Sequence, residues 1–190
     1  MRLDELNALD RAAAERALLR CCGSERWARE MAARRPWANL EAMGEEADKI
    51  WCGLATADHL QAFAAHPRIG ESGSSGGSSE SGGSGRSLES GGSGASGGAG
   101  GGGTREHWSS QEQSRVTAAI DDVRERLAAA NDDYHARFGF IFIVCATGKS
   151  AEEMLMILDE RLKHSHEEEL RIASEEQRKI TRVRLEKLLA

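Results

Sequence analysis

A run of glycine and serine in the middle of the chain limits what its 190 residues can fold into. Between positions 71 and 103, 26 of 33 residues are Gly or Ser, so this stretch has almost no apolar area to bury. A coil of this length has an end-to-end distance on the order of 30 Å, so it joins two packed halves without fixing how they meet. We therefore expect an N-terminal helical half at 1–70, a Gly/Ser-rich flexible insert at 71–103 and a C-terminal helical half of the same domain at 104–190.

Apolar residues before the insert recur at three- and four-residue intervals, which is typical of amphipathic helices. Residue types that favour helix starts precede three of these segments, at Asp10, Ser24 and Asn39. Gly23 is placed as the C-cap of the first segment. Thr56 is expected to cap a further helix, so the sequence predicts at least four helices in this half.

The half after the insert is also predicted to be helical. A stripe of apolar residues from Val116 to Phe138 predicts a helix of about 28 residues that Gly139 closes. Ser150 and Glu153 have the spacing of a capping box, and a final helix is expected at roughly 167–189. The run "FIFIVCA" at 140–146 fits a short strand, an extended segment or a helix start. We expect an all-α domain, a single compact bundle of about seven or eight helices.

Charge and hydropathy exclude several classes of function. The net charge is −6 and no Lys/Arg cluster is interleaved with aromatic residues, which argues against nucleic-acid binding. The longest apolar run is far shorter than the roughly 20 residues that cross a bilayer, and no hydrophobic signal core is present. The four cysteines have no zinc-type or C-x-x-C spacing, so reduced thiols used for packing are expected. These features predict a soluble, cytoplasmic protein without membrane or nucleic-acid partners.

Two motifs resemble ligand sites but have simpler explanations. "ATGKS" at 146–150 ends like a phosphate-binding loop, yet Ile143 stands where that motif needs its leading glycine. A tight turn into a capped helix is expected there. "HSHEEE" at 164–169 has residue types that bind metals, but a solvated helix start with acidic residues near the positive dipole end explains it better.

Three other features leave a structural and a functional interpretation open. His66 and Pro67 either mark an ordinary helix end or hold an imidazole outside the helix. Ser109 and Glu112 form a capping box in "SSQEQS", whose first-turn N–H groups also favour an anionic ligand. Arg184 falls on the apolar face of the last helix, where it either forms a buried ion pair, extends its head group to solvent, or grips a carboxylate or carbonyl.

Taken together, four blocks of the sequence resemble one family. The blocks are "HPRIGE" (66–71), "WSSQEQS" (108–114), "FGFIFIVCATGKSAEEML" (138–155) and "ELRIASEEQRKITRVRLEKLL" (169–189). Their order resembles that of the OHCU decarboxylases of urate breakdown, OHCU being 2-oxo-4-hydroxy-4-carboxy-5-ureidoimidazoline. The resemblance implies an all-α carboxy-lyase, usually a homodimer, that converts OHCU to (S)-allantoin with neither a metal nor an organic cofactor.

The resemblance also implies roles for individual residues. It makes His66 the catalytic histidine that handles the proton and Glu112 the matching catalytic carboxylate. A histidine suits a proton step because its ordinary pKa is about 6.5. The substrate-binding positions implied are Pro67, Ser109, Ser110, Gln111, Gln113, Val144, Cys145, Ala146, Thr147, Gly148 and Arg184. The Gly/Ser insert departs from the family, because it is longer and richer in glycine than expected.

A second hypothesis belongs to another class of function. The long apolar stripe from Val116 to Phe138 would be the partner-binding face of a non-catalytic helical interaction module. The C-terminal "KLLA" is not the peroxisomal tripeptide, so a bacterial cytoplasm is the expected location.

Overall fold

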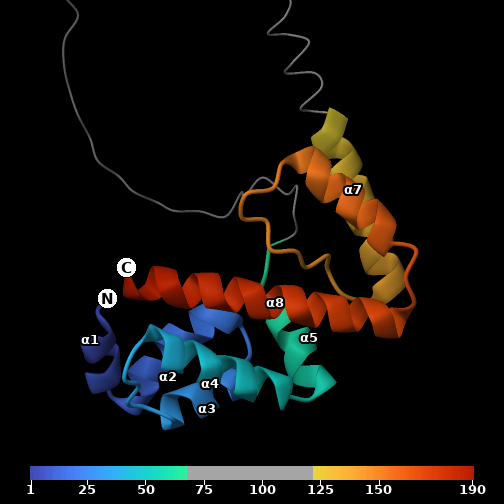
Figure 1. Ribbon diagram of the computed structural model, residues 1–190. Helices are drawn as coiled ribbons and strands as arrows, with labels where there is room; N and C mark the ends of the chain where they lie inside the picture. Colours follow the sequence, from blue (N-terminus) through green and yellow to red (C-terminus); the bar gives the residue numbers. More distant parts are fainter. Residues whose placement is uncertain (68–121) are drawn as a thin grey trace, which may run out of the picture. The chain divides into compact units, whose positions relative to one another are not determined.

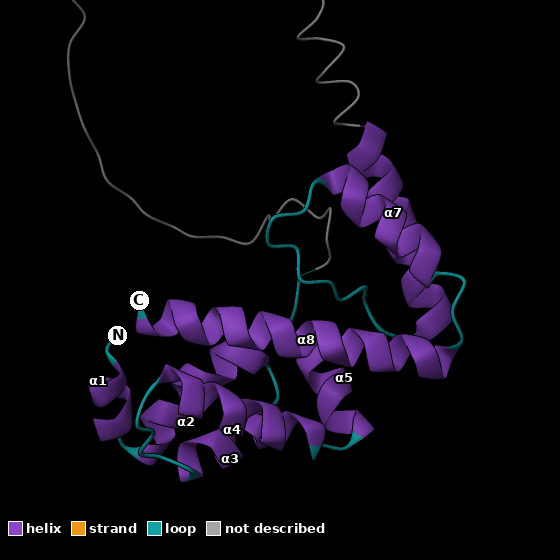
Figure 2. Cartoon of the chain, viewed as in Figure 1, coloured by secondary structure: helices purple, strands orange, loops and turns teal. Residues whose placement is uncertain are grey.

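The computed structural model describes residues 1–67 and 122–190, and residues 68–121, which include the predicted insert, lie outside the described ranges. All regular secondary structure in those two ranges is helical, as Figure 2 shows. The helices before residue 68 are α1 (Leu3–Ala8), α2 (Arg11–Cys22), α3 (Glu25–Ala33), α4 (Leu40–Cys52) and α5 (Thr56–Ala64). After residue 121 follow a helical segment at 122–138, α7 (Ala151–Arg161) and α8 (His166–Leu189) (Figure 1). The predicted all-α class is confirmed, whereas the bounds of the insert stay a prediction.

Three of the predicted caps form as expected. The side chains of Asp10, Ser24 and Asn39 accept hydrogen bonds from backbone N–H groups three residues on, at 2.8, 3.3 and 2.8 Å. Gly23 ends α2 with a φ of 88°, a left-handed conformation that suits glycine. A Cβ at Gly23 would lie 2.6 Å from the Cβ of Ala65, so glycine also allows the end of α2 to approach the end of α5.

Two details of the N-terminal half differ from the expectation. Thr56 was expected to cap α5, but Ala55 is the N-cap and Thr56 is the first helical residue. The Asp58 carboxylate accepts a 3.1 Å hydrogen bond from the N–H of Ala55, and this back-bond replaces a hydroxyl cap. Helix α1 was not predicted, because six residues with Leu6 as their single buried side chain carry little periodicity.

Helix α8 joins the two halves of the described chain. It packs against α2, α4 and α5, as Figure 1 also shows. The carboxylate of Asp48 on α4 pairs with both Arg178 and Arg182 of α8 at 2.9 Å. The indole N–H of Trp51 donates to the carbonyl of Ser174 at 3.1 Å. These polar contacts fix the register of α8 on the N-terminal half.

The helical segment at 122–138 turns its apolar side inward. Leu127, Tyr134 and Phe138 are buried, and Gly139 closes the helix with a φ of 77°. The beginning of the predicted helix lies outside the described residues. In the part that is described, the apolar stripe packs in the core, so these positions do not offer the exposed face that the interaction-module hypothesis requires.

An extended segment connects this helix to α7. Residues 141–146 form neither helix nor strand, so of the three possibilities for "FIFIVCA" the extended segment is the one observed. Phe142, Ile143 and Val144 are buried. The carbonyl of Ile143 accepts a 2.6 Å hydrogen bond from Arg161, and the N–H of Cys145 donates at 2.8 Å to the Glu176 carboxylate. Side chains of α7 and α8 therefore satisfy backbone groups that a sheet would otherwise pair.

The acidic start of α8 is only partly solvated, which corrects one prediction. Glu169 of "HSHEEE" is fully buried, where it pairs with Arg161 and accepts a hydrogen bond from the hydroxyl of Tyr134. His164 lies 3.0 Å from the same carboxylate. The prediction failed because Glu169 stands in a run of charged residues, which suggested solvent exposure. The buried Arg161 that compensates its charge lies on another helix, α7.

None of the helices in the described ranges is both long enough and apolar enough to cross a membrane.

Candidate active site

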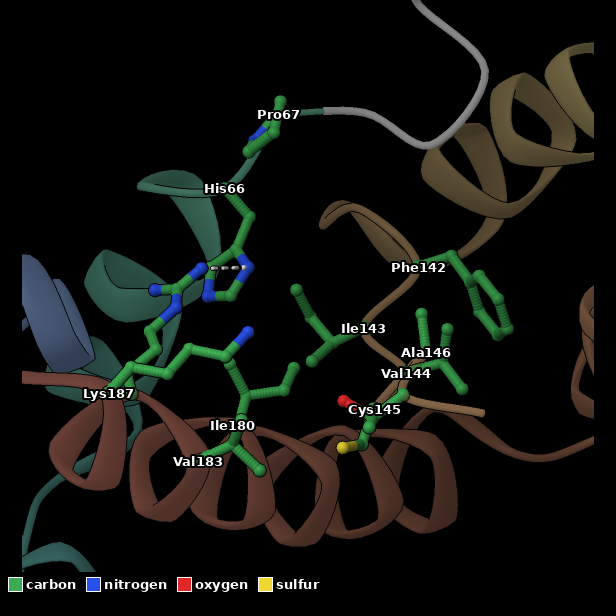
Figure 3. A pocket seen from close by; sticks show the side chains of 12 residues that line it. His66, Pro67, Phe142, Ile143, Val144, Cys145, Ala146, Ile180, Val183 and Lys187 are labelled. Atoms are coloured by element: carbon green, nitrogen blue, oxygen red, sulfur yellow. Dashed lines mark hydrogen bonds between the residues drawn. The ribbon is translucent and has the colours of Figure 1, made fainter. Parts of the chain in front are cut away.

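A pocket of about 270 Å³ lies beside the C-terminal end of α5. Its lining residues come from three parts of the chain: the end of α5, the extended segment and one face of α8 (Figure 3). They are His66, Pro67, Phe142, Ile143, Val144, Cys145, Ala146, Thr147, Ile180, Val183, Arg184 and Lys187. This volume lies just below the range of about 300–1,000 Å³ that is usual for ligand pockets.

The local sequence places the His66 ring outside its helix. Helix α5 ends at Ala64, and the N–H of His66 makes a last turn-like hydrogen bond of 3.1 Å to the carbonyl of Phe63. Pro67 disfavours helical geometry at the residue before it, so the chain leaves the helix at this point. Of the two interpretations of His66, the structure supports the one in which the imidazole points into a cavity.

Arg184 reaches the pocket from α8. Its Nη2 donates to Nδ1 of His66 at 3.3 Å, and its Nη1 donates to the carbonyl of Cys21 at 3.4 Å. No carboxylate of the described residues pairs with Arg184, so the buried ion pair considered from the sequence does not form within those ranges. The guanidinium contacts a carbonyl and an imidazole, and neither neutralises its charge.

His66 is neutral in this environment. Burial of the ring and the positive charge of Arg184 lower the pKa of His66 from 6.5 to about 4, while Gln177 acts in the opposite direction. The hydrogen bond leads to the same conclusion independently. Arginine only donates, so Nδ1 must be the accepting, unprotonated nitrogen of a neutral imidazole.

The extended segment that lines the pocket ends in a turn. The N–H of Lys149 bonds to the carbonyl of Ala146 at 3.0 Å, and Gly148 has a φ of 78°. Ser150 and Glu153 complete the capping box of α7, so the predicted tight turn is confirmed. Within the described ranges, the N–H groups of Ala146 and Thr147 have no hydrogen-bond acceptor, and both residues line the pocket.

The charged groups around the pocket favour an anionic or oxygen-rich ligand. Arg184 and Lys187 line it, and no Asp or Glu among the described residues does. Five lining residues were not predicted as site residues from the sequence: Phe142, Ile143, Ile180, Val183 and Lys187. Ile180 and Lys187 lie within one helical turn of Arg184, at i−4 and i+3, so helical spacing from Arg184 was the signal that would have found them.

Seven of the predicted site residues come together in this pocket: His66, Pro67, Val144, Cys145, Ala146, Thr147 and Arg184. Gly148 belongs to the same turn but does not line the cavity. The other five predicted residues, Ser109, Ser110, Gln111, Glu112 and Gln113, lie outside the described residues. Their position relative to the pocket stays a prediction.

The described ranges contain no group of three or more His, Cys, Asp or Glu side chains that could hold a metal ion. All four cysteines are free, as expected. Burial raises the pKa of Cys21 to about 11 and that of Cys22 to about 12, so both thiols stay protonated at neutral pH. Neither of them is placed to act as a nucleophile.

Comparison with known proteins gives a consistent result. A family model described as OHCU decarboxylase matches residues 7–95 and 94–186. A crystal structure of OHCU decarboxylase in the presence of (S)-allantoin is 32% identical and has a TM-score of 0.64. The alignment covers 90% of this chain and 96% of that one.

Curated relatives have related names. The uric acid degradation bifunctional protein TTL of Arabidopsis thaliana is 34% identical over 170 residues, which are 90% of this chain and 45% of the relative. A 2-oxo-4-hydroxy-4-carboxy-5-ureidoimidazoline decarboxylase of Amia calva is 35% identical over 86 residues, 45% of this chain and 49% of its own length. The aligned part thus spans about half the length of these curated relatives.

Proposed function

The chain belongs to the OHCU decarboxylase family, and we propose that it is a carboxy-lyase that converts OHCU to (S)-allantoin in urate breakdown. One observation carries this proposal. A neutral imidazole and a guanidinium with no carboxylate partner among the described residues meet in one pocket, through the 3.3 Å contact between His66 and Arg184. The first group handles a proton and the second binds developing negative charge, which are the two requirements of a decarboxylation without a cofactor.

The reaction breaks the bond between the ring carbon and the carboxylate carbon. CO₂ leaves, its bonding electron pair passes into the conjugated imidazoline, and a ring nitrogen takes up a proton from solvent. The carbon that lost CO₂ becomes a ring carbonyl as its hydroxyl proton is removed, and a proton adds to the neighbouring carbon that carries the ureido group. Negative charge therefore moves from the carboxylate onto the ring oxygens. Arg184 and the backbone N–H groups of Ala146 and Thr147, which have no acceptor among the described residues, are the donors that would stabilise this charge.

The apolar wall has a separate role in the proposal. Ile143, Val144 and Ile180 supply apolar surface to the pocket. A carboxylate held against such a surface loses hydrating water, whereas neutral CO₂ does not need it. This wall would favour loss of CO₂ and would shield one face of the ring, so that the proton arrives from the other face.

His66 is proposed to move the proton. A neutral ring can take the proton of the substrate hydroxyl before CO₂ leaves, and the resulting imidazolium can return a proton to carbon afterwards. The resemblance to the family adds Glu112 as the carboxylate that orients the imidazole or binds the hydroxyl. It also adds Ser109, Ser110, Gln111 and Gln113 as substrate contacts.

A kinetic assay tests the function. Freshly generated OHCU is mixed with the protein, its ultraviolet signal is followed, and the handedness of the allantoin is measured by circular dichroism. We expect decay well above the spontaneous rate and formation of the (S) product. Decay at the spontaneous rate with racemic allantoin would contradict the proposal. Dialysis against a chelator is expected to leave the rate unchanged, because the proposed steps use only protein groups.

Three further proposals concern the assembly, the location and the domain organisation of the chain. We infer that the chain forms a homodimer, which size-exclusion chromatography with light scattering tests. We also propose that it acts in a bacterial cytoplasm, and that 1–70 and 104–190 are halves of one domain interrupted by the insert at 71–103. A stable monomer at micromolar concentration would contradict the first of these inferences.

A further inference from the structure

Two buried polar atoms, one on a pocket residue and one on α8, have no hydrogen-bond partner among the described residues, and each could pair with the other. Among the described residues, Nε2 of His66 and Oε1 of Gln177 are both buried and complete no hydrogen bond. Gln177 itself is fully buried, with 0% of its surface exposed. Its side chain is nevertheless close enough to His66 to raise the pKa of that ring as a hydrogen-bonding neighbour. An unpaired buried polar group destabilises the fold, so pairing these two atoms would be favourable.

The orientation of the Gln177 amide follows from its other contacts. Its Nε2 donates to the carbonyl of Cys22 at 3.2 Å and to the hydroxyl oxygen of Thr181 at 3.3 Å. The Thr181 hydroxyl gives its own hydrogen to the carbonyl of Gln177 at 3.0 Å, so it can only accept from the amide. A flipped amide would set two oxygens against each other, and Oε1 is therefore the atom left for His66.

The contact with Arg184 determines the tautomer of His66. Arg184 donates to Nδ1, so the hydrogen of the neutral ring belongs on Nε2. That nitrogen is the buried one. The ring thus has a donor on its buried edge and a lone pair on the edge that meets Arg184 and the pocket.

We propose that Gln177 is a positioning residue that accepts the Nε2 hydrogen of His66 and thereby directs the Nδ1 lone pair to the substrate. This inference rests on the proposed decarboxylase function. It makes Nδ1 the nitrogen that exchanges the proton. The role of Gln177 is to act through His66, because Gln177 does not line the pocket.

The proton count fixes what must happen to Arg184. When Nδ1 takes the hydroxyl proton, the ring becomes an imidazolium with hydrogens on both nitrogens, and Nδ1 can no longer accept from the guanidinium. Arg184 must then transfer its Nη2 donor to a substrate oxygen, where negative charge develops. Throughout, Gln177 Oε1 keeps accepting from Nε2, so one edge of the ring stays anchored while the other changes partner.

The direct test reads the tautomer without using activity. In protein with ¹⁵N-labelled histidine, long-range ¹H–¹⁵N correlation at neutral pH distinguishes the protonated from the unprotonated ring nitrogen. His66 is assigned by the signal that disappears in His66→Asn. We expect a neutral ring with its hydrogen on Nε2. A hydrogen on Nδ1 would overturn the inference whatever the enzyme's activity.

Three variants separate positioning from packing. Gln177→Met keeps the volume but removes the acceptor, so we expect mixed tautomers and a kcat lower by at least about tenfold, with a smaller effect on KM. Gln177→Glu supplies a stronger acceptor and is expected to raise the pKa of His66 and shift the pH profile upward. Thr181→Val is the matched control, because it removes a hydrogen bond to the same amide but leaves Oε1 in place. It should keep the wild-type tautomer.

The outcomes can be told apart. An unchanged tautomer in Gln177→Met, or equal changes in Gln177→Met and Thr181→Val, would overturn the role of Gln177. If Gln177→Met does not fold, the tautomer of the wild-type ring and the pH profile of Gln177→Glu still decide the question. A wild-type protein with the expected tautomer but no decarboxylation would instead contradict the proposed function.

Discussion

Arg184 donates a 3.3 Å hydrogen bond to Nδ1 of His66, and the two residues are separated by 118 positions in the sequence. Both side chains would be positively charged if His66 were protonated. The positive charge of Arg184 therefore adds to burial in keeping the ring neutral, with a pKa of about 4. A ligand that brings negative charge between them would offset that repulsion and make the ring a better base.

Replacing His66 by alanine should abolish catalysis while leaving the fold intact. We expect kcat to fall by about 10²-fold or more, since a positioned proton-transfer group contributes that much. Far-UV circular dichroism should be unchanged, because His66 lies beyond the last residue of α5. His59→Ala, which alters a histidine inside α5, is the control for loss of an imidazole. Unfolding of the His66 variant would favour a structural role for this residue.

Arg184→Lys should reduce kcat/KM by about tenfold to a hundredfold, although the charge is kept. A lysine lacks the planar fork that reaches both His66 and the carbonyl of Cys21. Arg182→Lys is the matched control on the same helix, because Arg182 pairs with Asp48 on α4 instead. Equal losses in the two variants would show that the effect arises from packing of α8.

The depressed pKa of His66 predicts a pH-dependent stability. Above pH 6.5 the ring is neutral in both states. Between pH 6.5 and about 4 the unfolded chain binds a proton that the folded chain does not, so stability falls as the pH falls and levels off below 4. After allowance for partial exposure, the loss is about 1–2 kcal/mol. Urea unfolding at pH 7, 5.5 and 4.5 should show this slope in the wild type and a shallower one in His66→Gln.

Arg161→Met should destabilise the protein by about 3–5 kcal/mol, because it leaves Glu169 buried without its countercharge. The double variant Arg161→Met/Glu169→Leu should recover part of this loss, since it removes both charges. Urea denaturation measures both effects. KM should also rise in the folded single variant, as Arg161 holds the carbonyl of Ile143 in the pocket wall. A single variant as stable as the wild type would refute the compensating role of Arg161.

Local rules predicted the helices well because their signals are local. Asp10, Ser24 and Asn39 each satisfy a backbone donor three residues away, so sequence neighbours alone define those helix starts. The prediction for Thr56 was wrong for a related reason. A carboxylate two residues further on, that of Asp58, competed for the same helix end and bonded to Ala55.

For contacts between distant segments, the sequence indicated which residue types would take part but not which residues would pair. Periodicity showed that Arg184 points inward but not that its partners are the Cys21 carbonyl and His66. The burial of Glu169 could not be predicted either, because the arginine that neutralises its charge belongs to a different helix. The resemblance to the family selected the site residues, whereas Lys187 and Ile180 emerged only once the pocket was defined.

The left-handed turn at Gly23 has a consequence for how the protein tolerates sequence change. The last carbonyls of a helix have no partners within it, and at the end of α2 those of Cys21 and Cys22 accept from Arg184 and Gln177. Because both acceptors belong to the main chain, substitution of either cysteine leaves them in place. These acceptors therefore persist when either cysteine is replaced by a residue that fills the same buried volume, whereas replacement of Gly23, which lines no part of the pocket, would disturb the turn that presents both of them.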